Sequence, residues 1–238
     1  IDSIKTIKGN QNNLIGGSAS YFSLSASKFA KVRVVGVVGD DFPKDGWEMF
    51  ENNNIDVSNI QIKHGKTFTW GGEYSVDYSS RETLYTNLGV FEGFSPLINS
   101  VGLQSKYIFL GNIQPYLQLQ VKNQIKKNSF IICDTMNLWI DNNYEELLNV
   151  ISNIDVFMLN EEEAKQLTNM DTVSSAGNHL LRCGPKAIIV KMGEDGAILF
   201  DGNNEILIPS VPNITVCDPT GAGDSFAGGF VGYISKHG

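Results

Sequence analysis

The sequence has few cysteines and no long hydrophobic run. The three cysteines among its 238 residues, Cys133, Cys183 and Cys217, are scattered and lack the C-x-x-C spacing of thiolate zinc sites and redox motifs. Such a small, odd number also argues against a disulfide-rich secreted scaffold, so we expect a reducing, cytoplasmic compartment. The apolar stretches, such as Val34–Val38, are far shorter than a membrane span, and no signal-peptide pattern opens the chain.

Basic residues are also scarce. Eighteen Lys and Arg residues stand against 26 Asp and Glu residues, which gives a net charge of -8. This charge repels phosphate polymers and anionic membranes, so neither nucleic acid nor a membrane is an expected partner. A local phosphate site made of backbone N–H groups needs no basic side chain and remains compatible with the charge. With 42% hydrophobic residues, 24 Gly and only 7 Pro, the composition is that of a globular protein.

Short strand-like runs alternate with helical patterns from Lys31 onward, which is typical of an α/β protein. We therefore expect a central, mostly parallel sheet flanked by helices on both faces. The expected strands are Val32–Val38, Tyr107–Leu110, Phe130–Cys133, Val156–Leu159, Ala187–Lys191, Ala197–Phe200 and Ile206–Ile208. The expected helices are Gly46–Asn52, Leu117–Lys126, Tyr144–Ser152, Glu161–Leu167 and Thr172–Arg182, and another runs from the turn near residue 221 to about Lys236.

The connections between these elements are short, so we expect one domain over residues 1–238. Because the chain opens at Ile1 rather than Met and stops at Gly238, just after a helical run, we expect the domain to be truncated at both ends.

The stretch Thr67–Val90 interrupts the alternation of strands and helices. Its aromatic and β-branched residues alternate with polar ones, which predicts an antiparallel strand pair with one wet face. Such an excursion can serve as a lid that keeps water out of a site, and a surface hairpin without a role is the alternative. We expect a small β-sheet lid formed by about residues 3–13 and 65–92.

The segment DPTGAGDSFAGG, residues 218–229, carries the most chemical information. Gly221, Ala222 and Gly223 are small, and they precede a helix whose first N–H groups can bind a tetrahedral anion. Asp224 in the first helical turn can then accept a proton from a hydroxyl that attacks phosphorus. The alternative is that Asp224 only caps the helix. The sequence has no Walker motif, so a Walker-type phosphate loop is not expected. The absence of an early G-x-G-x-x-G argues against a nicotinamide dehydrogenase.

Asn160 and Glu163 follow an expected strand and fall three residues apart in the first turn of a helix. Their oxygen atoms can face one ligand and suit Mg²⁺ that keeps several of its waters. The same spacing is that of a capping box, and the two roles are compatible with each other.

The segment around Asp224 resembles the C-terminal signature of ribokinase-like carbohydrate kinases, the PfkB family. Further segments of the chain resemble family motifs in the family's order, and together they span essentially the whole chain. These are Gly16-Gly17, the run from Val35 to Asp41, Asn160–Glu163, and the run from Lys191 to Gly196.

The resemblance implies a ribokinase-like fold and transfer of the γ-phosphoryl group of ATP to a hydroxyl. Asp224 would be the base, the backbone of Gly221, Ala222 and Gly223 would form the anion hole, and Asn160 and Glu163 would bind Mg²⁺. The implied nucleotide-binding residues are Lys191, Gly193, Gly196, Thr220, Gly221 and Gly223. Asp218 and Thr220 match positions that hold a monovalent cation such as K⁺ in several relatives.

The resemblance places the acceptor near Asp2, Gly16 and Gly17. Trp70 and Asn87 on the expected lid are further candidate acceptor contacts, and packing within the lid is the alternative for Trp70. Many family members have Asn four residues after the second glycine, whereas this chain has Tyr21, which either stacks on a ring or belongs to the core.

The departure at Tyr21 leaves the identity of the acceptor open. We expect a sugar or a sugar-like polyol, with a nucleoside, or a non-catalytic ligand-binding role, as the alternatives. A homodimer formed through the lid is a further expectation.

Overall fold

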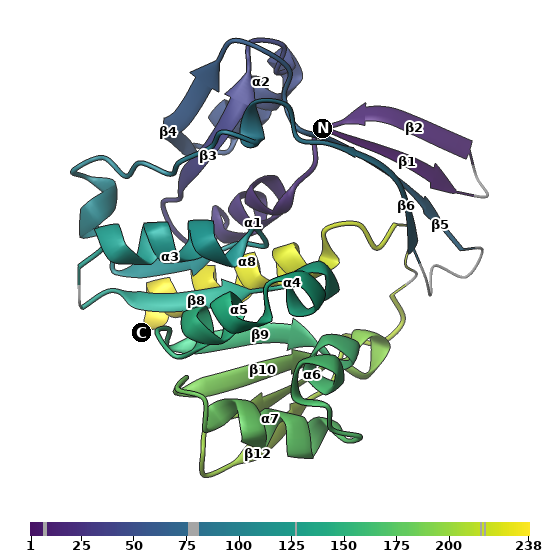
Figure 1. The fold of residues 1–238 in the computed structure, drawn as a ribbon, viewed down its shortest axis with the longest axis vertical. Helices are drawn as coiled ribbons and strands as arrows, with labels where there is room; N and C mark the ends of the chain where they lie inside the picture. Colours follow the sequence, from purple (N-terminus) through teal and green to yellow (C-terminus); the bar gives the residue numbers. More distant parts are fainter. Residues whose placement is uncertain (7–8, 76–80, 127, 215, 217) are drawn as a thin grey trace. The chain divides into compact units, whose positions relative to one another are not determined.

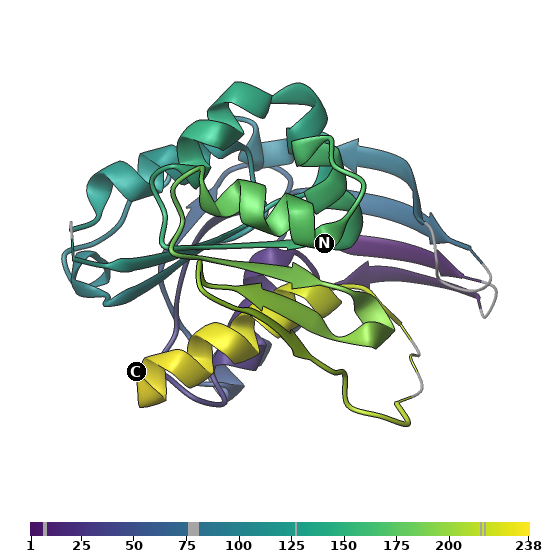
Figure 2. The same cartoon turned by 90° about the horizontal axis from the view of Figure 1, so that it is seen from below.

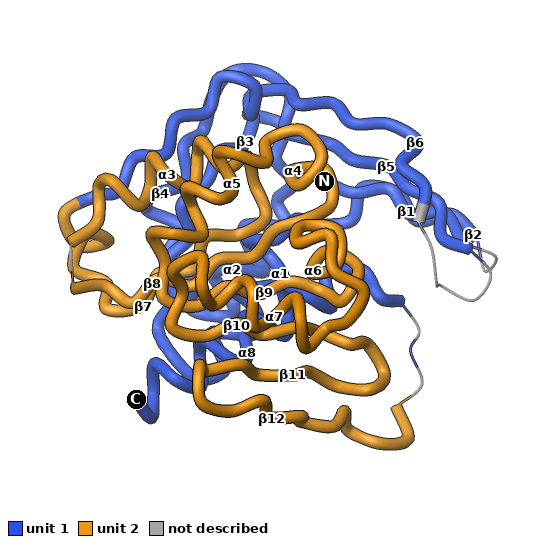
Figure 3. The backbone as a smooth tube through the Cα atoms, turned by 60° about the horizontal axis from the view of Figure 1, so that its bottom comes forward, with its two compact units in different colours: residues 1–99, 216–238 blue, residues 100–215 orange. Residues whose placement is uncertain are grey.

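The computed structural model describes residues 1–6, 9–75, 81–126, 128–214, 216 and 218–238 (Figure 1). The chain divides into two compact units, which Figure 3 shows in two colours. Unit 1 comprises residues 1–99 and 216–238, and unit 2 comprises residues 100–215. Cys217 and parts of the expected lid, residues 7–8 and 76–80, lie outside the described residues.

A four-stranded sheet in unit 1 corresponds to the expected lid. Its strand order is β2-β1-β5-β6, with parallel β1 and β5 in the centre and an antiparallel partner on each side. The bounds are Asp2–Thr6 for β1, Gly9–Leu14 for β2, Thr69–Tyr74 for β5 and Arg81–Asn87 for β6. The antiparallel pair predicted from the alternation in Thr67–Val90 is therefore confirmed. Its function as a lid stays a prediction.

Two glycines let aromatic rings lie directly on this sheet. A Cβ atom at Gly71 would overlap the ring of Tyr85, and one at Gly72 would overlap the indole of Trp70. Successive residues of a strand face opposite sides of a sheet, so the two rings cover opposite faces.

A second, two-stranded sheet in unit 1 pairs β3 (Arg33–Gly39) in parallel with β4 (Asp56–Lys63), and helix α2 (Lys44–Asn52) connects them. Val34, Phe50 and Ile55 form the buried centre of this βαβ unit. The sequence analysis predicted β3 and α2 but missed β4. The 3-10 helix η1 (Gly89–Phe91) follows β6.

The loop between these two sheets is fixed by Asp41. Its carboxylate accepts hydrogen bonds from the backbone N–H of Thr67 at 2.7 Å and from its hydroxyl at 2.8 Å. The Thr67 hydroxyl in turn accepts from the Gly39 N–H at 2.9 Å. These bonds connect the end of β3 to the residues that lead into β5.

Helices α1 (Ser18–Ala26) and α8 (Ala222–His237) pack closely against each other in unit 1 (Figure 1). A Cβ atom at Gly228 would overlap the carbonyl oxygen of Phe22, and one at Gly232 would lie 3.0 Å from the carbonyl oxygen of Ala26. The Ser25 hydroxyl donates to the Ser225 carbonyl at 2.7 Å. Glycines four residues apart therefore let the backbone of α1 lie directly on α8.

Unit 2 contains a six-stranded sheet in the order β12-β11-β10-β9-β8-β7. Strands β7 to β10 are parallel, and β11 and β12 are antiparallel to their neighbours. The strands are β7 (Tyr107–Leu110), β8 (Phe130–Asp134), β9 (Val156–Asn160), β10 (Ala187–Lys191), β11 (Ala197–Phe200) and β12 (Glu205–Ile208). All six strands predicted for this region are confirmed.

The helices of unit 2 cover one face of this sheet (Figure 2). They are α3 (Pro115–Gln124), α4 (Asn137–Asn142), α5 (Tyr144–Ile151), α6 (Glu161–Thr168) and α7 (Val173–Leu181), with the 3-10 helices η2 (Gly102–Gln104) and η3 (Gly193–Asp195) in loops. Helix α4 was not predicted. The core below them contains the fully buried side chains of Leu147, Phe157 and Ile188.

Within the described part of the chain, no helix is long and apolar enough to cross a membrane. Cys133 is a buried free thiol and Cys183 is a half-buried one.

The α1–α8 contact predicts different outcomes for two neighbouring glycines. Gly228→Ala places a methyl group against the Phe22 carbonyl, and we expect it to lower the free energy of unfolding by about 1–3 kcal/mol. Gly229→Ala is the matched control, because its methyl group would lie 3.4 Å from the movable Ser25 hydroxyl. Alanine favours helix over glycine by up to about 1 kcal/mol, so the control should be neutral or stabilising. Urea unfolding measures both, and equal destabilisation by the two variants would contradict this account.

Candidate functional site

The N-terminus of α8 begins at a sharp turn. Gly221 adopts the left-handed conformation, with φ of 70°, and Asp224 follows in the first helical turn. Thr220 donates its N–H to the Asp218 carboxylate at 2.8 Å, which closes the turn before the helix. The Ala222 N–H donates to the Pro219 carbonyl at 3.1 Å. The helix dipole directs positive charge toward this turn, as binding of an anion requires.

Asp2 lies against the Gly-Gly pair that precedes α1. Its carboxylate occupies the space where a Cβ atom at Gly16 would lie, and the residue is only 6% exposed. Gly17 caps α1 with φ of 86°. The structure therefore brings Asp2, Gly16 and Gly17 together, as the sequence analysis expected of an acceptor site.

Tyr21 connects this region to the turn before α8. Its ring covers Gly221 so closely that a Cβ atom there would overlap it. Burial, together with the negative charges of Asp2, Asp218 and Asp224, raises the pKa of Tyr21 to about 12. Tyr21 is therefore near both Asp2, a predicted acceptor residue, and Asp224, the expected base. The sequence analysis left it as a core or stacking residue, and only the substitution for Asn pointed to it.

The lid sheet reaches the same turn through Tyr74. The Thr220 hydroxyl donates to the Tyr74 hydroxyl at 2.9 Å, and Tyr74 on β5 is only 8% exposed. The sequence analysis did not assign Tyr74 to the site. The signal was present in the alternation of β5, which places Trp70 and Tyr74 on one face of the strand.

The two lid residues predicted to contact the acceptor differ in placement. Trp70 pairs in register with Asp2 on the neighbouring strand, so both side chains belong to one face of the sheet. Its indole N–H donates to the Thr83 hydroxyl at 3.3 Å. Asn87 is exposed, and its amide donates to the Thr69 hydroxyl at 3.1 Å. Asn87 therefore bonds within the lid sheet, and its role toward an acceptor stays a prediction.

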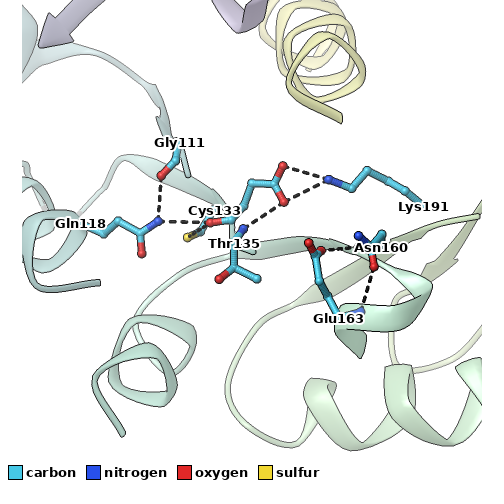
Figure 4. A network of polar contacts seen from close by, with 8 residues as sticks. Gly111, Gln118, Cys133, Thr135, Asn160, Glu163 and Lys191 are labelled. Atoms are coloured by element: carbon cyan, nitrogen blue, oxygen red, sulfur yellow. Dashed lines mark hydrogen bonds and ion pairs between the residues drawn. The ribbon is translucent and has the colours of Figure 1, made fainter. Parts of the chain in front are cut away.

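Unit 2 gathers polar side chains where three neighbouring parallel strands end. Asp134 ends β8, Asn160 ends β9 and Lys191 ends β10 (Figure 4). The Lys191 ammonium group lies 3.0 and 2.9 Å from the two oxygens of Asp134, which also accepts the Thr135 N–H at 3.0 Å. The side chains of Lys191 and Asp134 are only 16% and 5% exposed. The carboxyl ends of parallel strands are the usual place for ligand sites in α/β proteins.

Asn160 and Glu163 form a complete capping box on α6. The Asn160 side chain accepts the Glu163 N–H, and the Glu163 carboxylate accepts the Asn160 N–H, both at 2.8 Å. Burial raises the pKa of Glu163 to about 7, and the charges of Asp134 and Glu162 contribute to the rise. The capping role predicted from the spacing is therefore confirmed.

The same oxygens fit Mg²⁺ bound largely through water. Among the described residues, no group of three or more His, Cys, Asp or Glu side chains is arranged to enclose a metal ion. Mg²⁺ is held in many nucleotide sites by one or two protein oxygens, waters and phosphates, so a small donor set is compatible with it. The magnesium role of Asn160 and Glu163 stays a prediction.

Gly193 and Gly196 form the turn between β10 and β11. Both have positive φ, 58° and 98°, and a Cβ atom at Gly196 would overlap the Ile208 carbonyl. The Met192 N–H donates to the Gly196 carbonyl at 2.8 Å. The expected tight turn is confirmed, whereas its role beside a nucleotide stays a prediction.

Glu163 gives the stability of the protein a defined pH dependence. The folded state binds this proton more tightly than the unfolded state, because the pKa is about 7 rather than 4.5. Its stabilisation is full below about pH 4.5 and is lost as the pH rises to about 7, with a magnitude of about 3 kcal/mol at most. Urea unfolding from pH 4 to 8 without Mg²⁺ should show wild type losing stability relative to Glu163→Gln across that window. A constant difference between the two proteins would show that Glu163 ionises normally.

The sequence was compared with known proteins and structures. The model of the pfkB family carbohydrate kinases matches residues 8–238. A cytidine kinase of Thermococcus kodakarensis is 29% identical over 242 aligned residues, which cover 99% of this chain and 86% of the relative. A nucleoside kinase of Methanocaldococcus jannaschii is 22% identical over 93% of this chain and 72% of the relative.

A solved structure shows the same fold. An Escherichia coli protein described as a ribokinase II, in complex with ATP and Mg²⁺, superposes with a TM-score of 0.84. The match covers 99% of this chain and 83% of that chain at 19% identity. The predicted ribokinase-like fold and kinase class are both confirmed. The chain therefore belongs to the pfkB family of carbohydrate kinases and is an ATP-dependent phosphotransferase.

Proposed function

We propose that this kinase transfers the γ-phosphoryl group of ATP to a hydroxyl of a pentose-containing acceptor, a nucleoside or a free sugar, with Asp224 as the base. The observation that carries the proposal is the placement of Asp224 in the first turn of α8, directly after the left-handed Gly221. Asp2 and Tyr21 supply acceptor-facing groups next to that turn. A purely ligand-binding relative would have no use for a base beside an anion-binding helix terminus.

In the proposed step, the acceptor hydroxyl loses its proton to a carboxylate oxygen of Asp224 as its oxygen bonds to the γ-phosphorus. The bond between that phosphorus and the bridging oxygen breaks, and ADP leaves. The N-terminus of α8, with the backbone N–H groups of Gly221 and Gly223, stabilises the negative charge on the transferring group, whereas the Ala222 N–H already donates to the Pro219 carbonyl at 3.1 Å. The left-handed conformation of Gly221 forms the sharp turn that begins α8, and the absence of a Cβ atom leaves space for the ring of Tyr21.

We assign the nucleotide-binding role to the cluster in unit 2. Asn160 and Glu163 would hold Mg²⁺, which neutralises phosphate charge when bound. Asp134 holds the ammonium group of Lys191 with both oxygens, so this cation is positioned before a phosphate arrives. Gly193 and Gly196 would border the nucleotide.

Thr220, in the turn before α8, is a further candidate for nucleotide binding. Its carbonyl oxygen and that of Asp218 are the candidates for binding a monovalent cation such as K⁺.

A nucleoside is the first acceptor to test. The relatives that match 99% and 93% of this chain are named for cytidine and for nucleosides, which supports this choice over a free sugar. A homodimer through the lid sheet and a cytoplasmic location stay predictions.

The direct test is ADP release from MgATP in the presence of nucleosides, pentoses and hexoses. We expect Asp224→Asn to lower kcat for the accepted substrate by about 10²–10⁴-fold, because the amide cannot take the proton. The KM for ATP should change little. Asp45→Asn is the matched control, since Asp45 is an exposed carboxylate in the first turn of α2 and should leave kcat unchanged. Wild-type protein that phosphorylates none of these acceptors would overturn the proposed function, and an undiminished kcat in Asp224→Asn would remove Asp224 as the base.

The role of Lys191 is tested with its ion-pair partner neutralised at the same time. Replacing Lys191 alone leaves a buried carboxylate without its cation, which destabilises proteins strongly. The double variant Asp134→Asn/Lys191→Met avoids that penalty. We expect the double variant to raise the KM for ATP about tenfold or more and to leave the KM for the acceptor unchanged. An unchanged KM for ATP in a folded double variant would confine the pair to a structural role.

A further inference from the structure

A groove in unit 2 lies at the amino ends of β8, β9 and β10. Its volume is about 760 Å³, which is within the range of small-molecule sites. Phe130, which begins β8, lines it together with Asp155 and Lys186, which directly precede β9 and β10. Strand β10 has five residues, so Lys191 at its other end is about 16 Å away along the strand. The groove is therefore separate from the candidate nucleotide cluster.

The groove is basic, although the whole chain has a net charge of -8. Its described lining contains the lysines Lys122, Lys126 and Lys186 and a single acidic residue, Asp155. One oxygen of the Asp155 carboxylate lies 2.7 Å from the Lys186 ammonium group, and the other accepts the Ile131 N–H at 2.8 Å. Asp155 therefore compensates the charge of Lys186. The charges of Lys122 and Lys126 have no acidic partner in the described lining.

Lys122 is held in position by a neutral group. Its ammonium group donates to the side-chain oxygen of Asn153 at 2.9 Å, and the Asn153 amide nitrogen donates to the Asn149 carbonyl at 2.8 Å. The amide orients the ammonium group without neutralising it. The C-terminal end of α3 also favours a cation at Lys122, so this residue alone would not indicate a ligand.

Lys126 supplies the second uncompensated charge. It is exposed and lies beyond the end of α3 at Gln124. Within the described part of the chain, its ammonium group makes no hydrogen bond or ion pair. Because like charges that line one groove repel each other, an anion with two negative charges would stabilise both lysines.

The groove also offers an apolar surface. Ile131 and Ile154 line it, and so does the half-buried ring of Phe130. This ring packs edge-on against Tyr107 with the centroids 5.8 Å apart, and the Lys186 ammonium group lies 5.9 Å from its centroid. Apolar side chains beside a few charged groups are typical of a site for a small organic ion. The net charge of the chain argues against a nucleic acid as the occupant.

We propose that this groove is a second ligand site, which binds a small phosphate monoester. The phosphate oxygens accept hydrogen bonds from Lys122 and Lys126, and the organic part lies against Phe130, Ile131 and Ile154. A phosphate monoester carries close to two negative charges at neutral pH and can use both ammonium groups, whereas a monocarboxylate compensates only one. The site does not depend on the proposed catalytic function.

The test is titration calorimetry of the whole chain with phenyl phosphate at about 0.15 M salt. We expect Lys122→Gln/Lys126→Gln to weaken binding about tenfold or more, because two charge-assisted hydrogen bonds are lost. The matched control is Lys28→Gln/Lys44→Gln, which removes the same charge from unit 1. Lys28 is also exposed and also donates to an asparagine side chain, that of Asn53, at 2.8 Å. The control should change the affinity less than about twofold.

Phenol and inorganic phosphate test the two halves of the ligand. Each should bind at least about tenfold more weakly than phenyl phosphate, because phenol lacks the charge and inorganic phosphate lacks the apolar part. Equal affinity of wild type and Lys122→Gln/Lys126→Gln overturns the inference, as does the absence of binding. Inorganic phosphate that binds as tightly as phenyl phosphate would remove the apolar surface from the site and likewise overturns it.

Lysine acetylation followed by mass spectrometry locates the ligand on the wild-type protein, which keeps the inference testable if the groove variant fails to fold. Phenyl phosphate should slow acetylation of Lys126 at least about threefold and leave the exposed Lys44 unchanged. Protection of Lys191 without protection of Lys126 would place the ligand in the candidate nucleotide cluster. That result, or unchanged acetylation of Lys126, overturns the assignment of the groove.

Discussion

The close packing of α1 against α8 is the constraint on which the arrangement of unit 1 around the start of α8 depends. Gly228 and Gly232 remove the side chains that would separate the helices, and Ser25 adds a hydrogen bond to the Ser225 carbonyl. These contacts hold the two helices at a fixed separation. The ring of Tyr21 on α1 lies over Gly221, and just before α1 the carboxylate of Asp2 lies over Gly16. The close approach of the two backbones thus fixes the start of α8, where Asp224, the proposed base, lies.

In unit 2, charged side chains are largely buried at one edge of the sheet. The parallel strands β8, β9 and β10 end side by side, so Asp134, Asn160 and Lys191 lie at one edge of the sheet. Lys191 compensates the buried Asp134, whereas the buried Glu163 has a pKa raised to about 7 despite the Asn160 N–H that it accepts. An edge with a positioned cation and a carboxyl group that ionises near neutral pH can respond to a phosphate and a metal ion. A sheet edge lined only by apolar side chains would offer no charged group to a phosphate or a metal ion.

Much of the fold was predictable because its signals are local. Strands β8, β9 and β10 are nearly continuous apolar runs, which indicate burial on both faces. The capping box of Asn160 and Glu163 depends on two residues three positions apart, and the turn at Gly221 depends on neighbours in the chain. Strand β4 was missed because Asp56–Lys63 mixes polar and apolar residues. Its strand conformation is stabilised by its parallel pairing with β3. Helix α4 has only six residues, too few for a helical period to emerge.

The sequence by itself determined the α/β class, the position of Asp224 at a helix N-terminus and the glycine turns, because each follows from short-range conformational preference and residue spacing. Tertiary structure decided which distant groups meet. Lys191 pairs with Asp134 across 57 positions, and Ser25 bonds to Ser225 across 200. The position of Tyr21 follows from the same long-range packing, which places a phenol near carboxylates from two distant segments of the chain. No local pattern contains this information, because it arises only when burial of apolar faces folds the chain back on itself.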